Sequence, residues 1–592
     1  MCGIAGELRF DGAPADVAAV DRMSARMRPR GPDGCGLWLR GPSALAHRRL
    51  TIIDLSRAGE QPMVDPELGL SLVFNGCIYN YRELRAELVG HGYRFFSTSD
   101  TEVILKAYHR WGAACVERFA GMFAFVIIER ETGRAVMARD RLGIKPLYLA
   151  RGPRRLRFAS TLPALVAAGD VDTSIDPEAL HHYLTFHSVV PAPATILAGV
   201  RKLPPATVKT IEPDGSERDR VYWRPSFERA AADGARSDGA WEEAILEKLR
   251  LAVSRRLVAD VPVGVLLSGG LDSSLIVALV AERAPKDLKT FSIGFEPAGG
   301  MAGDEFVYSD AVAKAFGTEH HQIRVDDRRL FPAVRGAIAA MSEPMVSHDA
   351  VAFYLLSEQV AKHVKVVQSG QGADEIFAGY DWYPPLADTP RDRAVDVYTA
   401  AFCDRDRAEL ERIVEPAYLP AADVSRRYVV DHFAAPGAET ALDAALRLDA
   451  TVMLVDDPVK RVDNMTMAWG LEGRVPFLDH ELVELAAACP PRLKLAQGGK
   501  GVLKSLARKL LPAAVIDRPK GYFPVPGIRH LQGDLLATVR DALESADART
   551  RGLFRRDYVS AALSTPNARS NLGVNTVWQL GLLELWLRGG AA

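Results

Sequence analysis

The first third of the chain alternates short apolar runs with polar turns, a pattern typical of β-strands. Residues Leu70–Gly76 (LSLVFNG) form one such run and end on Asn-Gly, a turn signal. The runs Met122–Glu129 and Ala135–Arg139 flank a short polar stretch with a glycine, which predicts a hairpin. Helical patterns lie between these strands. Residues 2–205 are therefore predicted to form a layered α+β domain, with antiparallel sheets between helices.

The pattern changes after residues 206–240, a polar and turn-rich stretch that we expect to connect two domains. From residue 241 onwards, apolar runs alternate with helical runs, which is the pattern of a parallel α/β sheet. Beyond Tyr380 the pattern is mainly helical. Residues 241–592 are thus predicted to form a second domain with a helical C-terminal part. Its strands are expected at Val261–Leu267, Lys289–Phe295 and Val364–Val367.

The composition narrows the class of protein. A chain of 592 residues is too long for one hydrophobic core, which agrees with two domains. The 73 Lys and Arg residues balance 75 Asp and Glu residues, so the bulk charge favours neither nucleic acid nor an anionic membrane as a partner. Neither a membrane-spanning apolar run nor a secretory pattern is found, and the cysteines lack CxxC spacing. We expect a cytoplasmic protein that acts on small molecules.

Cys2 is the first candidate for chemistry. If Met1 is removed, the thiol of Cys2 lies beside an α-amino group with an ordinary pKa of about 7.7 to 8.0, which can serve as its base. A lone cysteine at this position would more often be a small buried residue. Here the FNG motif also offers an amide side chain and a glycine N–H, both suited to an oxyanion hole. The candidate partners of the thiol are Arg49, Asn75, Gly76 and Asp100.

Several motifs together resemble the glutamine amidotransferase domain of the N-terminal-nucleophile class, as in the asparagine synthetase family: CGIAG, RGPD, AHRRLTIID, FNGCIYNY, TSDTEVIL and GMFAF…RDRLGIKPLY. The resemblance implies that Cys2 attacks the side-chain amide of glutamine and releases ammonia. It implies that Arg49 holds the α-carboxylate of glutamine and that Asp100 holds its ammonium group. The family usually has a glutamate after the Asn-Gly pair, where this chain has Cys77. The implied oxyanion and glutamine-binding residues also include Ile53, Asn75 and Gly76.

The motif SGGLDSS carries a second candidate site. It reads as a strand, a Gly-rich turn and a helix, an arrangement whose backbone N–H groups bind anions. An ordinary strand-to-helix connection is the alternative, while a Walker A loop and a GxSxG hydrolase elbow lack their defining residues. The motif resembles the pyrophosphate loop of ATP pyrophosphatases. That resemblance implies that Asp272 holds Mg²⁺ and that pyrophosphate is cradled by Ser268, Gly269, Gly270 and Ser273.

The resemblance to the synthetase half of the same family extends almost to the end of the chain. It implies an adenine pocket with Leu266 and Ile293, and a second wall of the nucleotide site in SGQGADEIFAGY. In that wall Ser369 and Gly370 would approach AMP, Asp374 would bind Mg²⁺ and Tyr380 would close the turn. The motif GKGVLKSLARKLLP carries Lys504 where the family has a lysine that neutralises phosphate charge. A solvated helix cation is an equally good interpretation of Lys504 from sequence alone.

Gln371 departs from the family pattern, in which a glutamate stands between the two glycines of SGEGADE. An amide has no proton that titrates near neutral pH, so Gln371 cannot act as a general base. Tolerated drift at one position is the simpler explanation. The sharper hypothesis is an acceptor site that differs from an aspartate site. The acceptor-site candidates are Gln371, Arg474 and Asp479.

These features predict a glutamine-, ATP- and Mg²⁺-dependent amidotransferase that passes ammonia to an acyl-adenylate and forms an amide, AMP and pyrophosphate. Aspartate is one possible acceptor. The chain most resembles the subgroup that forms N-acetylglutaminylglutamine amide, an osmoprotectant dipeptide, so a peptide-like carboxylate is the other. A ring-closing β-lactam synthetase-like enzyme would lack a functional terminal cysteine, and a non-enzymatic sensor would show erosion of SGGLDS or Cys2. A homodimer is possible; the lining of the ammonia path is not predicted.

Overall fold

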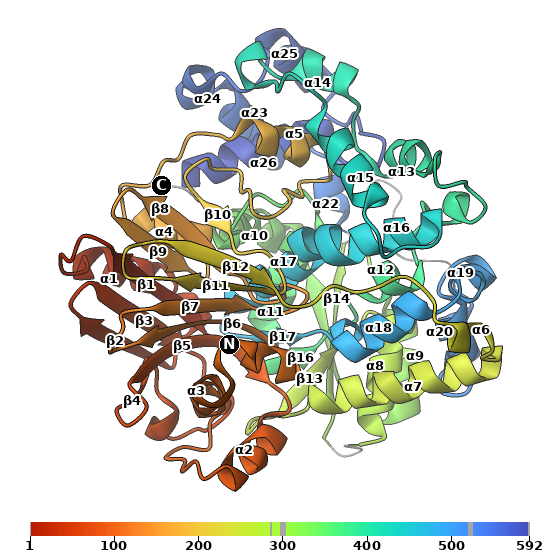
Figure 1. Ribbon diagram of the computed structural model, residues 1–592. Coiled ribbons are helices and arrows are strands. Elements are labelled where there is room, and N and C mark those ends of the chain that lie inside the picture. Colours follow the sequence, from red (N-terminus) through yellow and green to blue (C-terminus); the bar gives the residue numbers. More distant parts are fainter. Residues whose placement is uncertain (1, 284–286, 297–302, 519–524, 590–592) are drawn as a thin grey trace.

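The structure is a computed structural model that describes residues 2–283, 287–296, 303–518 and 525–589. It consists of two parts that lie side by side (Figure 1). The N-terminal sheets are on the left, and the parallel sheet with its helices is on the right and behind. In the described ranges, no helix is long and apolar enough to cross a membrane.

Two six-stranded antiparallel sheets form the N-terminal domain, as the hydrophobic pattern predicts. Alternate residues of β1 and β3 point to opposite faces: Ile4 and Leu45 pack on the other sheet, while Ala5 and Ala44 pack under helices. One sheet has the order β10 (Arg201–Lys202), β8 (Tyr148–Gly152), β9 (Arg155–Ala159), β1 (Gly3–Arg9), β3 (Ser43–Arg49), β2 (Gly34–Arg40). The other has the order β12 (Glu217–Val221), β11 (Thr207–Ile211), β7 (Ala135–Arg139), β6 (Gly121–Glu129), β5 (Leu70–Ile78), β4 (Met63–Asp65).

Helices cover both outer faces of this sandwich. α1 (Val17–Arg26) and α4 (Leu162–Ala167) lie on the sheet that contains β1, and α2 (Tyr81–Gly90) and α3 (Asp100–Trp111) lie on the sheet that contains β5. The predicted hairpin is confirmed, because β6 and β7 pair from Ala124 opposite Arg139 to Ile128 opposite Ala135. The domain therefore has the helix–sheet–sheet–helix layers expected of the N-terminal-nucleophile class.

The Asn-Gly pair that ends the predicted strand is not a turn. β5 continues through Gly76 to Ile78, and Gly76 pairs with Phe123 of β6. A side chain at Gly76 would place its Cβ 2.1 Å from the carbonyl oxygen of Met122. Glycine is thus required for the close approach of two strands and not for chain reversal.

The N-terminal domain also extends beyond the boundary expected at residue 205. β11 and β12 add to the second sheet, with Val208 opposite Ala138 of β7 and Arg220 of β12 opposite Val208. The residues of β12 are mostly exposed and charged, as suits an edge strand, and this polarity made the stretch resemble a linker. The connecting region therefore begins only after Val221.

A five-stranded parallel sheet forms the centre of the C-terminal domain. Its order is β15 (Glu319–Val325), β14 (Lys289–Phe295), β13 (Val263–Leu266), β16 (Val366–Gln368), β17 (Glu472–Arg474). The three predicted strands are present at its middle. The two edge strands were not predicted, because β15 is largely polar and half-exposed and β17 has only three residues.

Helices surround the parallel sheet and fill the C-terminal part, as predicted beyond Tyr380 (Figure 1). The helices that pack on its strands include α8 (Leu271–Ala281), α9 (Phe306–Phe316), α11 (Asp349–Val360) and α17 (Lys460–Met467). Further helices near the sheet are α7 (Asp238–Arg255), α10 (Asp327–Ala340), α12 (Ala373–Phe377), α18 (His480–Ala488), α20 (Gly501–Ala507) and α21 (Ala513–Ile516). The remaining helices are α5 (Pro177–Thr185), α6 (Ala231–Gly234), α13 (Ala394–Phe402), α14 (Arg407–Ile413), α15 (Val424–Ala434), α16 (Ala441–Leu448), α19 (Pro491–Leu495), α22 (Pro526–Arg529), α23 (Gly533–Glu544), α24 (Ala546–Arg551), α25 (Arg556–Ser564) and α26 (Thr576–Gly589).

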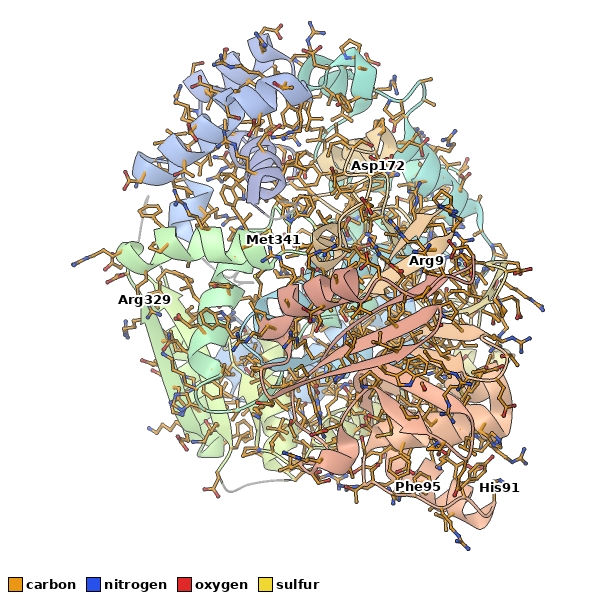
Figure 2. All side chains as sticks on the ribbon, turned by 90° about the vertical axis from the view of Figure 1, so that its left-hand side faces the viewer. Arg9, His91, Phe95, Asp172, Arg329 and Met341 are labelled. Atoms are coloured by element: carbon orange, nitrogen blue, oxygen red, sulfur yellow. The ribbon has the colours of Figure 1, made fainter. Side chains whose placement is uncertain are left out.

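The two domains meet through buried charges around α17. Asp463 lies 2.8 Å from Arg30 and 3.4 Å from Lys145, both of the N-terminal domain. Lys202 lies 2.8 Å from Asp456 and 3.0 Å from Glu343. In Figure 2, His91 and Arg329 lie at the edge of the molecule, while Met341 lies nearer its centre. Paired charges at this depth fix the register of the two domains, since an unpaired partner would be costly.

Candidate functional sites

A small cavity of about 30 Å³ brings together the residues predicted to bind glutamine. Five of the predicted residues line it: Cys2, Arg49, Ile53, Gly76 and Asp100. They come from the N-terminus, the end of β3 and the loop after it, β5 and the start of α3. The cavity is much smaller than the two cavities described below.

Asn75 lies against the nucleophile. Its Oδ1 accepts a hydrogen bond of 3.0 Å from the backbone N–H of Cys2, which orients the amide. Its Nδ2 is buried and has no hydrogen-bond partner among residues 2–283, 287–296, 303–518 and 525–589, which the structure describes. A buried amide donor without a partner is suited to stabilise an oxyanion that forms beside Cys2. Burial raises the pKa of the Cys2 thiol, so the thiolate has to be formed with the help of a base.

Arg49 and Asp100 are both held by the backbone. Arg49 donates hydrogen bonds of 2.9 Å and 2.5 Å to the carbonyl oxygens of Ser56 and Asp54. Asp100 accepts one of 3.0 Å from the N–H of Ile78 at the end of β5. Burial raises the pKa of Asp100 to about 6, although this hydrogen bond opposes the shift. Asp100 is therefore ionised at neutral pH, with little margin, and can face an ammonium group.

Two residues of the C-terminal domain also line the glutamine cavity, Glu472 and Arg474 of β17. The sequence predicted Arg474 as an acceptor-site candidate, but its side chain lies on the glutamine side. Its Nε donates to Glu472 at 2.5 Å, and its Nη2 lies 3.8 Å from Cys77 Sγ. Burial opposes ionisation of Glu472, yet surrounding positive charges, Arg474 and Lys145 among them, hold its pKa at about 2. Only proximity in the fold reveals this role, because β17 is distant from Cys2 in sequence.

Asp479, the other acceptor-site candidate from this segment, is not in a substrate cavity of appreciable size. It is the N-cap of α18, where it accepts from the N–H of Glu481. It lies 3.0 Å from Arg255 and 2.9 Å from Arg256, and these cations lower its pKa although burial opposes them. Its contacts are those of a structural carboxylate that joins α7 to α18.

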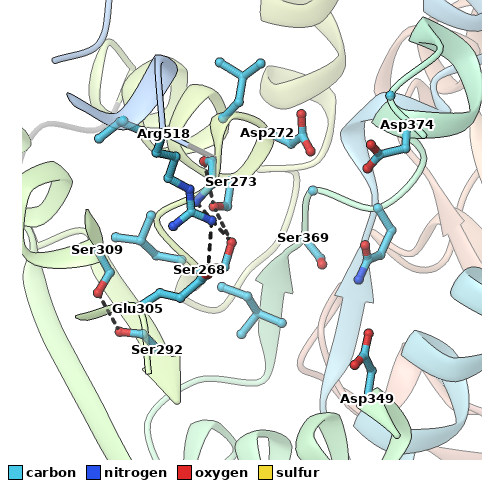
Figure 3. A pocket seen from close by; sticks show the side chains of 18 of the residues that line it. Ser268, Asp272, Ser273, Ser292, Glu305, Ser309, Asp349, Ser369, Asp374 and Arg518 are labelled. Carbon is cyan, nitrogen blue, oxygen red and sulfur yellow. Dashed lines mark hydrogen bonds and ion pairs between the residues drawn. The ribbon is translucent and has the colours of Figure 1, made fainter. Parts of the chain in front are cut away.

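A second cavity, of about 320 Å³, lies at the carboxyl ends of β13, β14 and β16 (Figure 3). This is where parallel α/β sheets bind their ligands. Ser268 Oγ and Ser273 Oγ are 3.1 Å apart across the Gly-rich turn, and the N–H of Gly270 donates to Ser268 Oγ at 3.3 Å. The turn requires glycine at Gly269, which has φ +74° and whose Cβ would lie 2.6 Å from the N of Ser309. Predicted residues that line the cavity are Leu266, Ser268, Gly270, Asp272, Ser273, Ile293, Ser369, Gly370, Gln371, Asp374, Tyr380 and Lys504.

The cation between the two predicted Mg²⁺ ligands is Lys500. Its Nζ lies 2.7 Å from Asp272 and 2.9 Å from Asp374. Burial would lower the pKa of Lys500, but the two carboxylates raise it above its ordinary value. Lys504 also lines the cavity and donates to the carbonyl oxygen of Gln497 at 2.6 Å. The sequence analysis selected Lys504 and did not name Lys500. Both lysines stand in the motif GKGVLK, and the motif alone does not show which of them contacts the two carboxylates.

Asp272 and Asp374 form a donor set that fits Mg²⁺. Their oxygens are hard ligands, and one lysine Nζ reaches both carboxylates, so the two side chains lie close together. Across the described residues, no group of three or more His, Cys, Asp and Glu side chains could hold a metal ion. Mg²⁺ commonly uses one or two carboxylates together with substrate phosphates and water, which this pair allows.

A third cavity, of about 550 Å³, adjoins the second and was not predicted. The two share the lining residues Asp349, Tyr380, Asp381 and Arg461. Its other walls come from residues near 187, 346, 401, 450, 529 and 574, so no single motif could reveal it. The segments Asp449–Met453 and Val455–Val459 of this wall are π-helical, a conformation often found at functional sites.

Buried carboxylates shape the third cavity. Asp449 accepts hydrogen bonds from Trp382 Nε1 at 3.1 Å, from Tyr383 at 2.6 Å and from Tyr398. Burial raises the pKa of Asp449 to about 6. Glu375 accepts a hydrogen bond of 2.8 Å from the hydroxyl of Tyr380, and burial raises the pKa of Glu375 to about 8. The wall thus combines aromatic side chains with buried carboxyl groups, of which Glu375 is uncharged at neutral pH.

Both halves of the chain match known protein families. A family model described as glutamine amidotransferase domain matches residues 1–223, and one described as asparagine synthase matches residues 244–588. Asparagine synthetase [glutamine-hydrolyzing] 1 of Bacillus subtilis (strain 168) is 32% identical over 99% of this chain and 96% of its own length. A putative asparagine synthetase [glutamine-hydrolyzing] of Mycobacterium tuberculosis (strain ATCC 25618 / H37Rv) is 34% identical over 93% and 91%.

Among solved structures, the glutamine phosphoribosylpyrophosphate amidotransferase of B. subtilis, complexed with ADP and GMP, matches with a TM-score of 0.29 and 17% identity over 48% of this chain and 64% of that one. The family assignment rests on the sequence comparisons, which span both domains. With a glutaminase pocket in one domain and a nucleotide cavity in the other, the chain belongs to the asparagine synthase family and is a glutamine-dependent ligase.

Proposed function

We propose that the enzyme amidates an extended, peptide-like carboxylate, N-acetylglutaminylglutamine, with ammonia from glutamine. The cavity of about 550 Å³ beside the nucleotide cavity carries this proposal. A single amino acid would leave most of that space to solvent, whereas the body of a dipeptide would fill it and place its terminal carboxylate toward the shared residues Tyr380 and Arg461. Aromatic side chains such as Trp382 and Trp578 provide apolar surface for an uncharged, acetylated terminus.

The proposed reaction begins with attack of the acceptor carboxylate on the α-phosphorus of ATP, which forms an acyl-adenylate and releases pyrophosphate. Mg²⁺ held by Asp272 and Asp374 would offset the charge on the departing pyrophosphate. Lys500 lies between these carboxylates and supplies a positive charge at the same place. The N–H groups of the Gly-rich turn before α8 orient the phosphates. Ammonia then displaces AMP and gives the amide.

Gln371 supports an acceptor other than aspartate. It lines the nucleotide cavity together with Ser369 and Gly370. Since an amide transfers no proton near neutral pH, the proton lost by ammonia has to leave by another group. A site with a glutamate at this position would not need another group, because the carboxylate could accept the proton.

Asparagine synthesis from aspartate is the second candidate function. It is favoured by the names of the relatives, which are asparagine synthetases over nearly the whole chain. The two functions differ in one measurable property, the acceptor that triggers pyrophosphate release.

An acceptor screen with purified protein, glutamine, ATP and Mg²⁺ tests the proposal. N-acetylglutaminylglutamine should release pyrophosphate and form its amide, and aspartate should give little. Val574→Phe, which fills part of the third cavity away from the nucleotide, should raise the KM for the dipeptide and leave any response to aspartate unchanged. Gln371→Glu should increase amidation of aspartate. Release that depends on aspartate alone, in all three proteins, would reject the dipeptide.

A further inference from the structure

We propose that Arg474 is a positioning residue of the glutamine pocket, contributed by the synthetase domain, and that it couples glutamine hydrolysis to occupation of the nucleotide cavity. The inference rests on the glutamine-dependent activity of the family and is independent of the acceptor proposed above. The side chain of Arg474 lines the glutamine pocket, and its backbone is hydrogen-bonded to Ser369, which lines the nucleotide cavity.

The side chain of Arg474 is held on every side. It is fully buried and lines the same cavity as Cys2 and Asp100. Its Nη1 donates to the carbonyl oxygens of Arg256 at 2.9 Å and Val258 at 2.7 Å. With Nε on Glu472 and Nη2 near Cys77 Sγ, the guanidinium has one orientation. A guanidinium group that is fixed by four contacts forms a rigid part of the pocket wall.

The backbone of Arg474 contacts the nucleotide wall. Its carbonyl oxygen accepts a hydrogen bond of 2.8 Å from the N–H of Ser369. This bond continues the β16–β17 ladder, in which Gln368 pairs with Arg474. Ser369 and Gly370 line the nucleotide cavity. A lining residue of the glutamine cavity is therefore hydrogen-bonded to a lining residue of the nucleotide cavity, and a shift of the Ser369–Gly370 loop would act on Arg474 through this bond.

The positive charge of Arg474 matters more in this chain because Cys77 stands where the family usually has a glutamate. A neutral thiol stands beside the guanidinium, and burial raises the pKa of Cys77 well above its ordinary value. The carboxylates that line this cavity are Asp100 and Glu472, and Arg474 binds the latter directly. The Glu472–Arg474 pair thus sets how much negative charge faces the ammonium group of glutamine.

The pairing of β16 with β17 indicates how coupling would operate. β17 forms one wall of the glutamine cavity, and β16 leads directly into the Ser369–Gly370 loop of the nucleotide cavity. Binding of ATP and acceptor against Ser369 and Gly370 would shift the β16–β17 ladder, and with it the guanidinium that lines the pocket beside Cys2, which links hydrolysis to a waiting acyl-adenylate.

The test compares Arg474→Met and Arg474→Lys in three assays: glutamine hydrolysis alone, glutamine hydrolysis with ATP and acceptor, and synthesis from ammonia. Arg474→Met should raise the KM for glutamine by at least about tenfold and abolish stimulation of hydrolysis by ATP and acceptor. Its ammonia-dependent synthesis should be retained. Arg474→Lys keeps a positive charge for Glu472 and should recover part of the affinity but not the full stimulation.

Lys202→Met is the matched control. Lys202 is also a buried cation between the domains, with Glu343 and Asp456 as partners, but it is not among the residues that line the cavities described above. It should lower thermal stability and leave the KM for glutamine unchanged. If Arg474→Met does not fold, the double variant Glu472→Gln/Arg474→Met removes both charges and replaces it in all assays.

Two results would overturn the inference. One is a folded Arg474→Met enzyme with unchanged KM for glutamine and unchanged stimulation. The other is an equal loss in Arg474→Met and Lys202→Met with both nitrogen sources, which would indicate a structural role only. Failure of the dipeptide proposal leaves these readouts intact, because hydrolysis of glutamine alone is measured without any acceptor, and aspartate can replace the dipeptide where stimulation is measured.

Discussion

The glutamine pocket and the synthetase cavities differ in size and in the segments that form them. The glutamine pocket measures about 30 Å³ and is built mostly from strand ends and loops of one domain. The synthetase cavities measure about 320 Å³ and 550 Å³, share four lining residues and draw on segments from residue 187 to residue 578. The first holds one small substrate around a nucleophile, and the second has to admit a nucleotide and an acceptor together.

This difference follows from the chemistry of each half-reaction. Ammonia has to be released unprotonated, so a tight pocket that excludes water is an advantage. Adenylation instead requires two substrates to be placed in line, which calls for a wide cavity with a few fixed charges such as Lys500. The two requirements explain why the sites are separate cavities, although each takes lining residues from the other domain, such as Arg474 in the glutamine pocket and His187 in the third cavity.

The largest expected effect is that of Cys2→Ala, which should affect one nitrogen source and not the other. Cys2→Ala removes the nucleophile, so glutamine-dependent synthesis should fall by at least about 10³-fold. Ammonia-dependent synthesis should be unchanged, because Cys2 does not line the synthetase cavities. Amide formation from each nitrogen source, measured by mass spectrometry, checks this. Loss with both sources would show that the sites do not function separately.

Lys500→Met should affect the synthetase site alone. Removal of the cation between Asp272 and Asp374 should slow pyrophosphate release by about 10²- to 10³-fold with either nitrogen source. Lys504→Met is the control in the same helix and cavity; it should lose less than about tenfold, because Lys504 binds the carbonyl oxygen of Gln497. Glutamine hydrolysis without ATP should stay normal in both. If Lys504→Met slowed pyrophosphate release more than Lys500→Met, Lys504 would be the lysine that neutralises phosphate charge, as predicted from sequence.

These lysines show how far sequence alone could reach. The fold class, the middle strands and the glutaminase residues follow from local patterns, since Cys2, Asn75 and Asp100 each stand in a short motif. Lys500 and Lys504 share one motif, and only the position of α20 against Asp272 and Asp374 distinguishes them. Arg474 reaches the glutamine pocket through the pairing of β16 with β17, a long-range contact with no local signature. The third cavity is likewise a product of tertiary packing.

The interface between the sites is the next place to perturb. Asp463→Asn leaves Arg30 and Lys145 buried without their carboxylate, which should cost about 3 kcal/mol of stability. Lys365→Met breaks an exposed interdomain pair, with Asp33 at 2.7 Å, and should cost less than about 1 kcal/mol. Calorimetry of both variants checks the difference. Equal shifts in melting temperature would mean that burial of the pair is unimportant.

The smallest expected effect is a pH dependence confined to the glutamine pocket. Burial, with a further contribution from Glu472, raises the pKa of Asp100 to about 6, while the Ile78 N–H and Arg474 oppose the shift. Asp100 has to be ionised to hold the ammonium group of glutamine. The ratio kcat/KM for glutamine should therefore decline more steeply below about pH 6 than above it, by an additional factor of about ten per pH unit.

Synthesis from ammonia, expressed per unprotonated ammonia, should lack this decline, because Asp100 does not line the synthetase cavities. Asp100→Asn should raise the KM for glutamine and remove the additional decline below about pH 6, since an amide has no carboxyl proton to gain. An additional decline that persists in Asp100→Asn would assign this titration to another group of the pocket, with Glu472 disfavoured by its pKa of about 2. The same profile recorded on Arg474→Met should shift to higher pH, because the cation that opposes protonation of Asp100 is gone. That shift would connect the electrostatics of the small pocket to a residue of the synthetase domain.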